Sequence, residues 1–210
     1  MNLPSTVLAG PLDFTQGGML SPFAGQYAVQ FRVIFFMLIA GLGVKAALVP
    51  LHFWLPGTYA NAPGPVAALF AIMTKVGAYA ILRVSTLIFG AQAGVMSQLI
   101  EPWLLPLALA TLLIGMLGVL AARYLREQVA YLVIASVGTL LTAFSLASPG
   151  GIAAGLYYLP HSVLAAAAFF LLAERVVQGR GELADRFEPG PTLAGAAWLG
   201  APFIVAAMLA

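Results

Sequence analysis

The sequence contains no cysteine and few charged residues. Without thiolates the chain cannot form a disulfide, a cysteine-ligated zinc site or an iron–sulfur cluster. Charged residues make up only 8 % of the chain, whereas soluble domains carry about 25 %. The net charge of +2 is also small and dispersed, unlike the basic surfaces that bind nucleic acids. We therefore expect no metal site, no cofactor and no nucleic-acid partner, and we do not expect a soluble domain.

Apolar residues fill most of the chain: 62 % of it is hydrophobic, and the mean hydropathy is +1.00. A helix needs about 20 apolar residues to cross a bilayer. Six segments meet this requirement, namely 29–56, 64–89, 103–122, 129–147, 151–173 and 193–210. The composition predicts an all-α, polytopic membrane helix bundle. Residues 1–28, which are polar and rich in glycine and proline, are predicted to form a loop before a transmembrane domain spanning 29–210.

A proline interrupts the first of these segments. Pro50 lacks a backbone N–H and clashes with the preceding helical turn, so we expect two half-helices, the second of which ends at Pro56. A proline kink without function is frequent in membrane helices. Lys45 lies five residues before Pro50, however, and broken helices beside ionisable groups form the ion sites of transporters. This arrangement favours a functional break.

Three ionisable residues lie deep in predicted membrane segments. Lys45 and Lys75 are the only lysines, and His161 lies in the fifth segment. At 1.5 Å per residue, each is roughly 15–20 Å from the start of its helix, near the middle of a ~30 Å apolar core. Since a charge at that depth costs about 2.5–3.5 kcal/mol on insertion scales, we interpret the three residues as a proton relay. A structural ion pair would need a buried carboxylate, but none of the seven acidic residues falls within a predicted segment.

The other residues near these sites have structural interpretations. His161 could instead satisfy a carbonyl freed by Pro160. His52, which directly follows the break, is predicted to give structural support rather than to join the relay. Trp54 is expected in the aromatic belt at the membrane surface. Glu174 is expected to pair with Arg175 or to end a helix in water.

The arginines predict the orientation in the membrane. Loops 123–128 and 174–191 carry five arginines, and the opposite side receives only Arg32 and Arg83. Positively charged loops remain in the cytoplasm, so we expect these two loops to be cytoplasmic.

Several stretches resemble a known superfamily. The run Lys45-Ala-Ala-Leu-Val-Pro-Leu-His-Phe-Trp-Leu-Pro56, the Lys75 segment and the run Tyr157-Tyr-Leu-Pro-His161 resemble the antiporter-like proton-pumping subunits. This superfamily includes membrane subunits of respiratory complex I, membrane-bound hydrogenases and Mrp-type cation/proton antiporters. Residues 66–77, 106–111 and 131–140 are most similar to the D subunit of Mrp antiporters.

The resemblance implies a partial antiporter-like fold in the cell membrane. It also implies other membrane subunits as partners in a hetero-oligomeric complex that moves protons and Na⁺ or K⁺ across the lipid bilayer. Lys45 would be the lysine of the broken helix, Lys75 the central relay lysine and His161 the relay histidine. The superfamily has a glutamate helix upstream and a second broken helix downstream, so the resemblance implies that this chain is a central piece truncated at both ends.

Three functions remain open from the sequence. The first is a cation/proton antiporter subunit. The second is a proton-pumping membrane subunit of a redox complex, either an NADH:quinone oxidoreductase or a hydrogenase. The third is a truncated subunit with only a structural role. The chain has no nucleophile constellation, phosphate-binding loop or metal-ligand cluster, so we expect a transporter subunit and not an enzyme.

Overall fold

The computed structural model describes residues 28–87, 101–180 and 185–188, together with a few positions between 198 and 205. The predicted loop 1–28, except for its last residue, lies outside these residues, as does most of the predicted segment 193–210.

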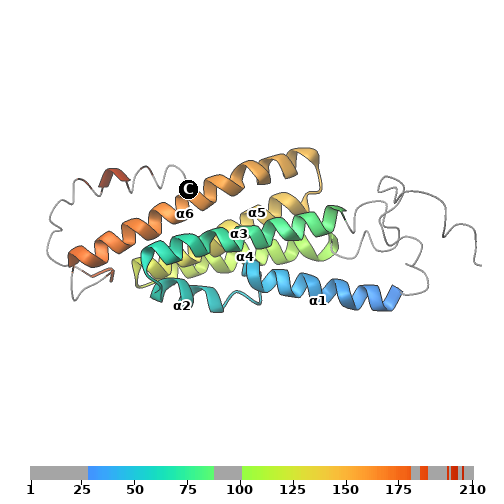
Figure 1. Ribbon diagram of the computed structural model, residues 1–210, viewed down its shortest axis with the longest axis horizontal. Helices are drawn as coiled ribbons and strands as arrows, with labels where there is room; N and C mark the ends of the chain where they lie inside the picture. Colours follow the sequence, from blue (N-terminus) through green and yellow to red (C-terminus); the bar gives the residue numbers. More distant parts are fainter. Residues whose placement is uncertain are drawn as a thin grey trace, which may run out of the picture.

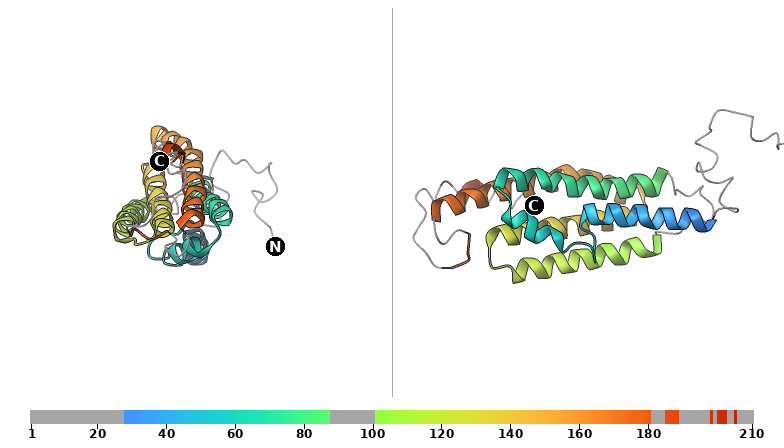
Figure 2. Two further views of the ribbon diagram at one scale, coloured as in Figure 1. Left: turned by 90° about the vertical axis from the view of Figure 1, so that its left-hand side faces the viewer. Right: turned by 60° about the horizontal axis from the view of Figure 1, so that its bottom comes forward.

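The described chain is an elongated bundle of helices (Figure 1). Its elements are α1 (Ala28–Ala46), α2 (Trp54–Asn61), α3 (Gly64–Leu87), α4 (Glu101–Ala121), α5 (Leu125–Ser145) and α6 (Pro149–Arg180). Four of them, α3 to α6, are long and apolar enough to cross a membrane. The end-on view in Figure 2 shows these helices packed side by side. The prediction of an all-α membrane bundle is therefore confirmed.

The predicted break in the first segment is present between α1 and α2. α1 ends at Ala46, directly after Lys45, and Pro50 lies in the connection that follows. Ala47 adopts a left-handed conformation with φ of 56°, while the Leu48 N–H donates to the Gly43 carbonyl at 2.8 Å. This hydrogen bond is typical of a Schellman helix end. The left-handed residue of such an end, here Ala47, is usually a glycine, because alanine costs about 1–2 kcal/mol in that conformation.

The predicted end of the second half-helix was wrong. Pro56 lies in the first turn of α2, and the helix continues to Asn61. The first four N–H groups of a helix have no partner within it, so proline's missing N–H costs nothing there. α2 ends instead just before Pro63, since the residue preceding a proline is disfavoured in helical geometry.

Two further boundaries differ from those predicted. α5 begins at Leu125 rather than at residue 129, and α6 continues to Arg180 instead of ending at residue 173. The 32 residues of α6 span about 48 Å, longer than a ~30 Å apolar core. Glu174 and Arg175 therefore lie on a helix that extends beyond the apolar core, and not in a loop.

Close approach of backbones sets the packing of the bundle. A Cβ atom on Gly138 of α5 would lie 2.4 Å from the Leu112 nitrogen of α4. Similarly, a Cβ on Gly77 of α3 would lie 2.9 Å from the Ala46 nitrogen. Small residues permit such contact between membrane helices. Gly77 thus brings the end of α1 against α3, two residues from Lys75.

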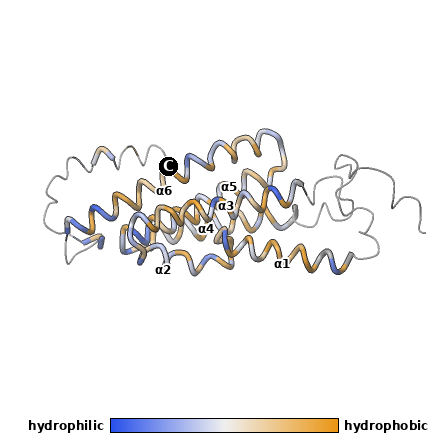
Figure 3. The backbone as a smooth tube through the Cα atoms, viewed as in Figure 1, coloured by the Kyte–Doolittle hydropathy of each residue, from blue (hydrophilic) through white to orange (hydrophobic). Residues whose placement is uncertain are grey.

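The connection into α5 and the segment after α6 meet at one end of the bundle. The Leu125 N–H donates to the Asp185 carbonyl, and the Arg126 N–H donates to the Asp185 carboxylate, each at 2.9 Å. The Phe187 N–H donates to the Arg123 carbonyl at 3.2 Å. We call this end, formed by residues 123–126 and 185–188, the loop end. The two predicted arginine-rich loops thus share one end of the bundle, where hydrophilic residues gather around the end of α6 (Figure 3).

Candidate functional site

Lys75 lies about 16 Å along α3 and is fully buried. Its ammonium group donates to the Ser136 hydroxyl of α5, and a longer bond of 3.4 Å reaches the Val133 carbonyl. Ser136 in turn donates to the same carbonyl at 2.7 Å. Among the described residues, no carboxylate lies within salt-bridge distance of Lys75. The amine is therefore held by neutral oxygens alone, which is an expensive arrangement for a permanent charge.

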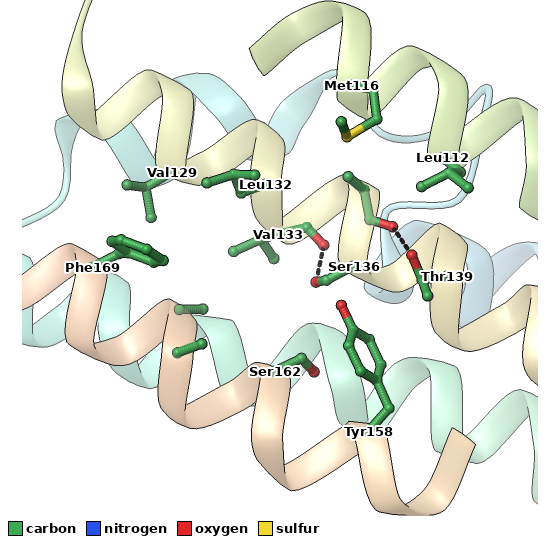
Figure 4. A pocket seen from close by; sticks show the side chains of 13 residues that line it. Leu112, Met116, Val129, Leu132, Val133, Ser136, Thr139, Tyr158, Ser162 and Phe169 are labelled. Carbon is green, nitrogen blue, oxygen red and sulfur yellow. Dashed lines mark hydrogen bonds between the residues drawn. The ribbon is translucent and has the colours of Figure 1, made fainter. Parts of the chain in front are cut away.

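A cavity of about 180 Å³ lies beside this contact, between α4, α5 and α6. Its walls include the hydroxyls of Ser136, Thr139, Tyr158 and Ser162 among apolar side chains. The Tyr158 hydroxyl points toward Ser136 (Figure 4). The lining is mainly apolar, and these four hydroxyls are the polar partners that water molecules in a space of this size would find.

A second cavity, of about 270 Å³, lies between α3 and α6 and is lined by Lys75 itself. Lys75 therefore stands between two spaces: its own side chain borders one of them, and its partner Ser136 borders the other. The hydroxyls beside Ser136 could take a proton from the amine on the first side, whereas the second cavity is lined by apolar side chains apart from Lys75 and Tyr79.

Lys45 is in a different environment. It is exposed in the last turn of α1, and within the described residues it has neither a hydrogen bond nor a salt bridge. The sequence correctly placed it at the break, but the structure does not bring it into contact with Lys75. Its positive charge at the end of α1 interacts favourably with the helix dipole.

Two side chains satisfy backbone groups freed at the break. The Trp54 indole donates to the Val44 carbonyl at 3.0 Å, and the Val49 N–H donates to the Thr111 hydroxyl of α4 at 3.1 Å. Such partners are required where a helix is broken at membrane depth. The indole N–H of Trp54 is thus used within the chain, and its place in the aromatic belt stays a prediction.

Thr111 is fully buried and also donates to the Leu107 carbonyl at 2.7 Å. We expect Thr111→Val to destabilise the break by about 1–3 kcal/mol, because it leaves the Val49 N–H without its acceptor. The melting temperature of the purified complex would fall. Thr111→Ser keeps the hydroxyl and should retain most of the stability. Equal melting temperatures for the valine and serine variants would contradict this role.

Among the described residues, neither histidine is hydrogen-bonded to Lys75 or Ser136. His161 is half-buried on α6, with its ring 6.0 Å from that of Tyr158. Its Nδ1 is buried and has no partner among the described residues, so this atom does not satisfy a carbonyl freed by Pro160. Nδ1 of His52, in the break, is also buried and has no partner among the described residues. Within the described residues, no hydrogen bond connects His161 with either lysine.

A charged cluster at the loop end was not predicted. Glu174 of α6 forms a salt bridge with Arg126 of α5, and not with Arg175. Its carboxylate also accepts the N–H of Gly64, the first residue of α3, at 3.1 Å, and the Gln178 amide at 3.3 Å. Only the spacing between Glu174 and Gln178 could have been found from the sequence, because Arg126 and Gly64 lie far away along the chain.

The family model described as "NADH:quinone oxidoreductase/Mrp antiporter, TM" matches residues 7–188. The chain belongs to this family. The match includes the break, Lys75, the cavity residues and the loop end.

Relatives within the family carry several names. The chain is 46 % identical over 142 residues to the D subunit of a probable K⁺/H⁺ antiporter of Rhizobium meliloti (strain 1021), covering 68 % of this chain and 26 % of the relative. It is 40 % identical over 146 residues to the D subunit of a Na⁺/H⁺ antiporter of Bacillus subtilis (strain 168), covering 69 % and 29 %. The N subunit of an NADH-quinone oxidoreductase of Mycobacteroides abscessus (strain ATCC 19977) is 35 % identical over 147 residues, covering 70 % and 27 %.

Among solved structures, the Mrp complex from Dietzia sp. DQ12-45-1b has a similar chain. The TM-score is 0.66 at 29 % identity, and the match covers 81 % of this chain and 31 % of the other. The chain thus spans between a quarter and a third of the length of these four relatives.

Proposed function

We propose that this chain is part of a D-type subunit of a multisubunit monovalent cation/proton antiporter, and that protons pass through it by way of Lys75. The observation that carries the proposal is the burial of Lys75 on a hydroxyl partner, between two cavities and without a carboxylate partner among the described residues. An ionisable group in such a place is by default a functional group of a membrane protein. The relatives named as antiporter D subunits support the same assignment.

In this function Lys75 accepts a proton from one cavity and releases it to the other. Ser136 orients the amine, because its hydroxyl accepts from Lys75 and donates to the Val133 carbonyl. Lys45 at the break changes its charge and neighbours to switch the path, and His161 carries protons onward from α6. The transported cation is Na⁺ or K⁺, the partners are other membrane subunits, and the arginine-rich loop end faces the cytoplasm.

A second candidate is a proton-pumping membrane subunit of a redox complex. The relative named as an NADH-quinone oxidoreductase subunit favours it, and the family description covers both kinds of complex. The same buried lysine would serve it, but electron transfer in other subunits would drive the protons.

Cation-dependent proton movement separates the two candidates. We would express the complete native complex in a host without its own antiporters and prepare everted vesicles with an imposed pH gradient. Under the proposed function, adding Na⁺ or K⁺ collapses the gradient, and vesicles without the complex give no response. A complex that ignores both cations but acidifies the vesicles when an electron donor is supplied would contradict the antiporter assignment and support the redox alternative.

A further inference from the structure

The cluster around Glu174 connects the starts of the two helices that meet at Lys75. One oxygen of its carboxylate accepts the Gly64 N–H of α3 and also contacts the Arg126 guanidinium of α5. The other oxygen accepts the Gln178 amide. Both charged side chains are largely removed from solvent, with exposed fractions of 15 % for Arg126 and 24 % for Glu174. A single carboxylate on α6 thus holds α3 and α5 together at the loop end.

α3 and α5 run in the same direction from this point. Lys75 follows Gly64 by 11 residues, and Ser136 follows Arg126 by 10. At 1.5 Å per residue, both side chains lie about 15–17 Å from the cluster, which is where Lys75 contacts Ser136. The two contacts therefore require the same axial register of α3 against α5. A slide of one residue, about 1.5 Å, is enough to break a hydrogen bond of ordinary length.

α3 and α5 make few direct contacts with each other. α3 packs mainly against α1 and α6, and α5 packs mainly against α4 and α6. α6 therefore stands between the two helices as the element to which both are attached. The start of α3 fits tightly there, because a Cβ on Gly64 would lie 2.7 Å from Cβ of Glu174 and 3.0 Å from the Phe170 carbonyl.

We propose that Glu174 sets the axial register of α3 against α5 and so positions Lys75 on Ser136. This role rests on the proposed function of Lys75, and it makes Glu174 a positioning residue, since it touches neither the amine nor the cavities beside it. Charge-assisted hydrogen bonds are stronger than neutral ones, and this difference is what Glu174→Gln removes. Glutamine keeps an oxygen for the Gly64 N–H but loses the charge that holds Arg126.

The register can be measured without transport. The chain has no cysteine, so spin labels at Leu69→Cys on α3 and Leu146→Cys after α5 are unique within it; both positions are exposed. Leu69 follows Gly64 by five residues and Leu146 follows Arg126 by 20, so the labels are offset by about 22 Å along the helix axes. In the complete complex we expect Glu174→Gln to shift the mean distance between the labels by about 1–1.5 Å, close to the rise of one residue, or to broaden the distribution equally. The control is Glu188→Gln, which removes an acid of the exposed pair with Arg186 and should change nothing. A distribution for Glu174→Gln that is the same as for Glu188→Gln would overturn the proposal.

A double-mutant cycle tests the connection to function. We expect Glu174→Gln and Ser136→Ala each to lower the maximal exchange rate at least threefold without changing the half-saturating cation concentration. Substitutions this far apart normally have independent effects. If Glu174 acts through the Lys75–Ser136 contact, adding Glu174→Gln to Ser136→Ala should lower the rate by less than a further twofold. Effects that simply multiply would show that Glu174 stabilises only the loop end.

Two outcomes need separate variants. If Glu174→Gln fails to assemble, Arg126→Lys keeps the positive charge but loses the planar guanidinium, and the same cycle and label distances apply to it. If removal of the Lys75 amine left exchange intact, this result would contradict the proposed function of Lys75 but not the role of Glu174 in setting the register. The label distances would then still decide whether Glu174 sets the register.

Discussion

Lys75→Met should lower cation/proton exchange at least about 100-fold, the scale on which loss of a proton-transfer group reduces rates, while the complex assembles normally. Methionine has nearly the length of lysine and no charge, so it fills the same buried volume beside Ser136. Replacing a buried charge by a well-packed apolar side chain is often neutral or stabilising. We therefore expect a melting temperature equal to or above that of the unsubstituted complex. Lys75→Ala should lose exchange as well, with lower stability because of the cavity that it leaves.

The measurement is the collapse of an imposed pH gradient in everted vesicles, at matched amounts of assembled complex. Arg83→Met is the matched control, because it removes a positive charge from the exposed end of the same helix and should leave exchange unchanged. Normal exchange by an assembled Lys75→Met complex would exclude Lys75 from the proton path. If exchange also tolerated alanine at both Lys45 and Lys75, a subunit with only a structural role would be favoured.

Lys45→Arg should lower exchange at least about tenfold without lowering stability. A structural role for Lys45 needs only a positive charge, which at the end of α1 contributes about 0.3–1 kcal/mol through the helix dipole. Arginine retains that charge but cannot release its proton in a protein. A relay that needs Lys45 to change its charge therefore stops, although the helix end remains equally stable. Lys45→Gln should lose exchange too and, in addition, the small dipole contribution.

The same vesicle assay, with thermal unfolding of the purified complexes, separates the two roles. Arg83→Lys is the control. It makes the reverse substitution, arginine to lysine, at an exposed position of α3 and should change neither the transport rate nor the stability. Full transport activity of the Lys45→Arg complex would mean that Lys45 acts only as a fixed positive charge at the end of α1. A group other than Lys45 would then have to connect the break with the proton path through Lys75.

The sequence by itself determined the membrane class, the position of the break and the place of Lys75 in the middle of a long apolar helix. These features follow from local physics. Long apolar runs predict spanning helices, and Pro50 predicts a kink or a break. A proline alone does not decide between the two, because α4 and α6 continue through Pro106 and Pro160. Local reasoning was less successful at Pro56 and at Glu174. A proline is harmless in a first turn, and the charged residues after 173 could not show that α6 continues beyond the apolar core.

Only the tertiary structure decided which residues meet. Ser136 lies 61 residues from Lys75, Thr111 lies 62 residues from Val49, and Glu174 lies 48 residues from Arg126. Helices such as α1 and α4 have almost no amphipathic pattern, so no polar stripe indicates which side faces a neighbour. The close approaches at glycines such as Gly77 and Gly138 set those faces. The hydroxyl beside Lys75 therefore depends on how the helices pack, whereas the lysine's depth was already determined by its place in an apolar segment.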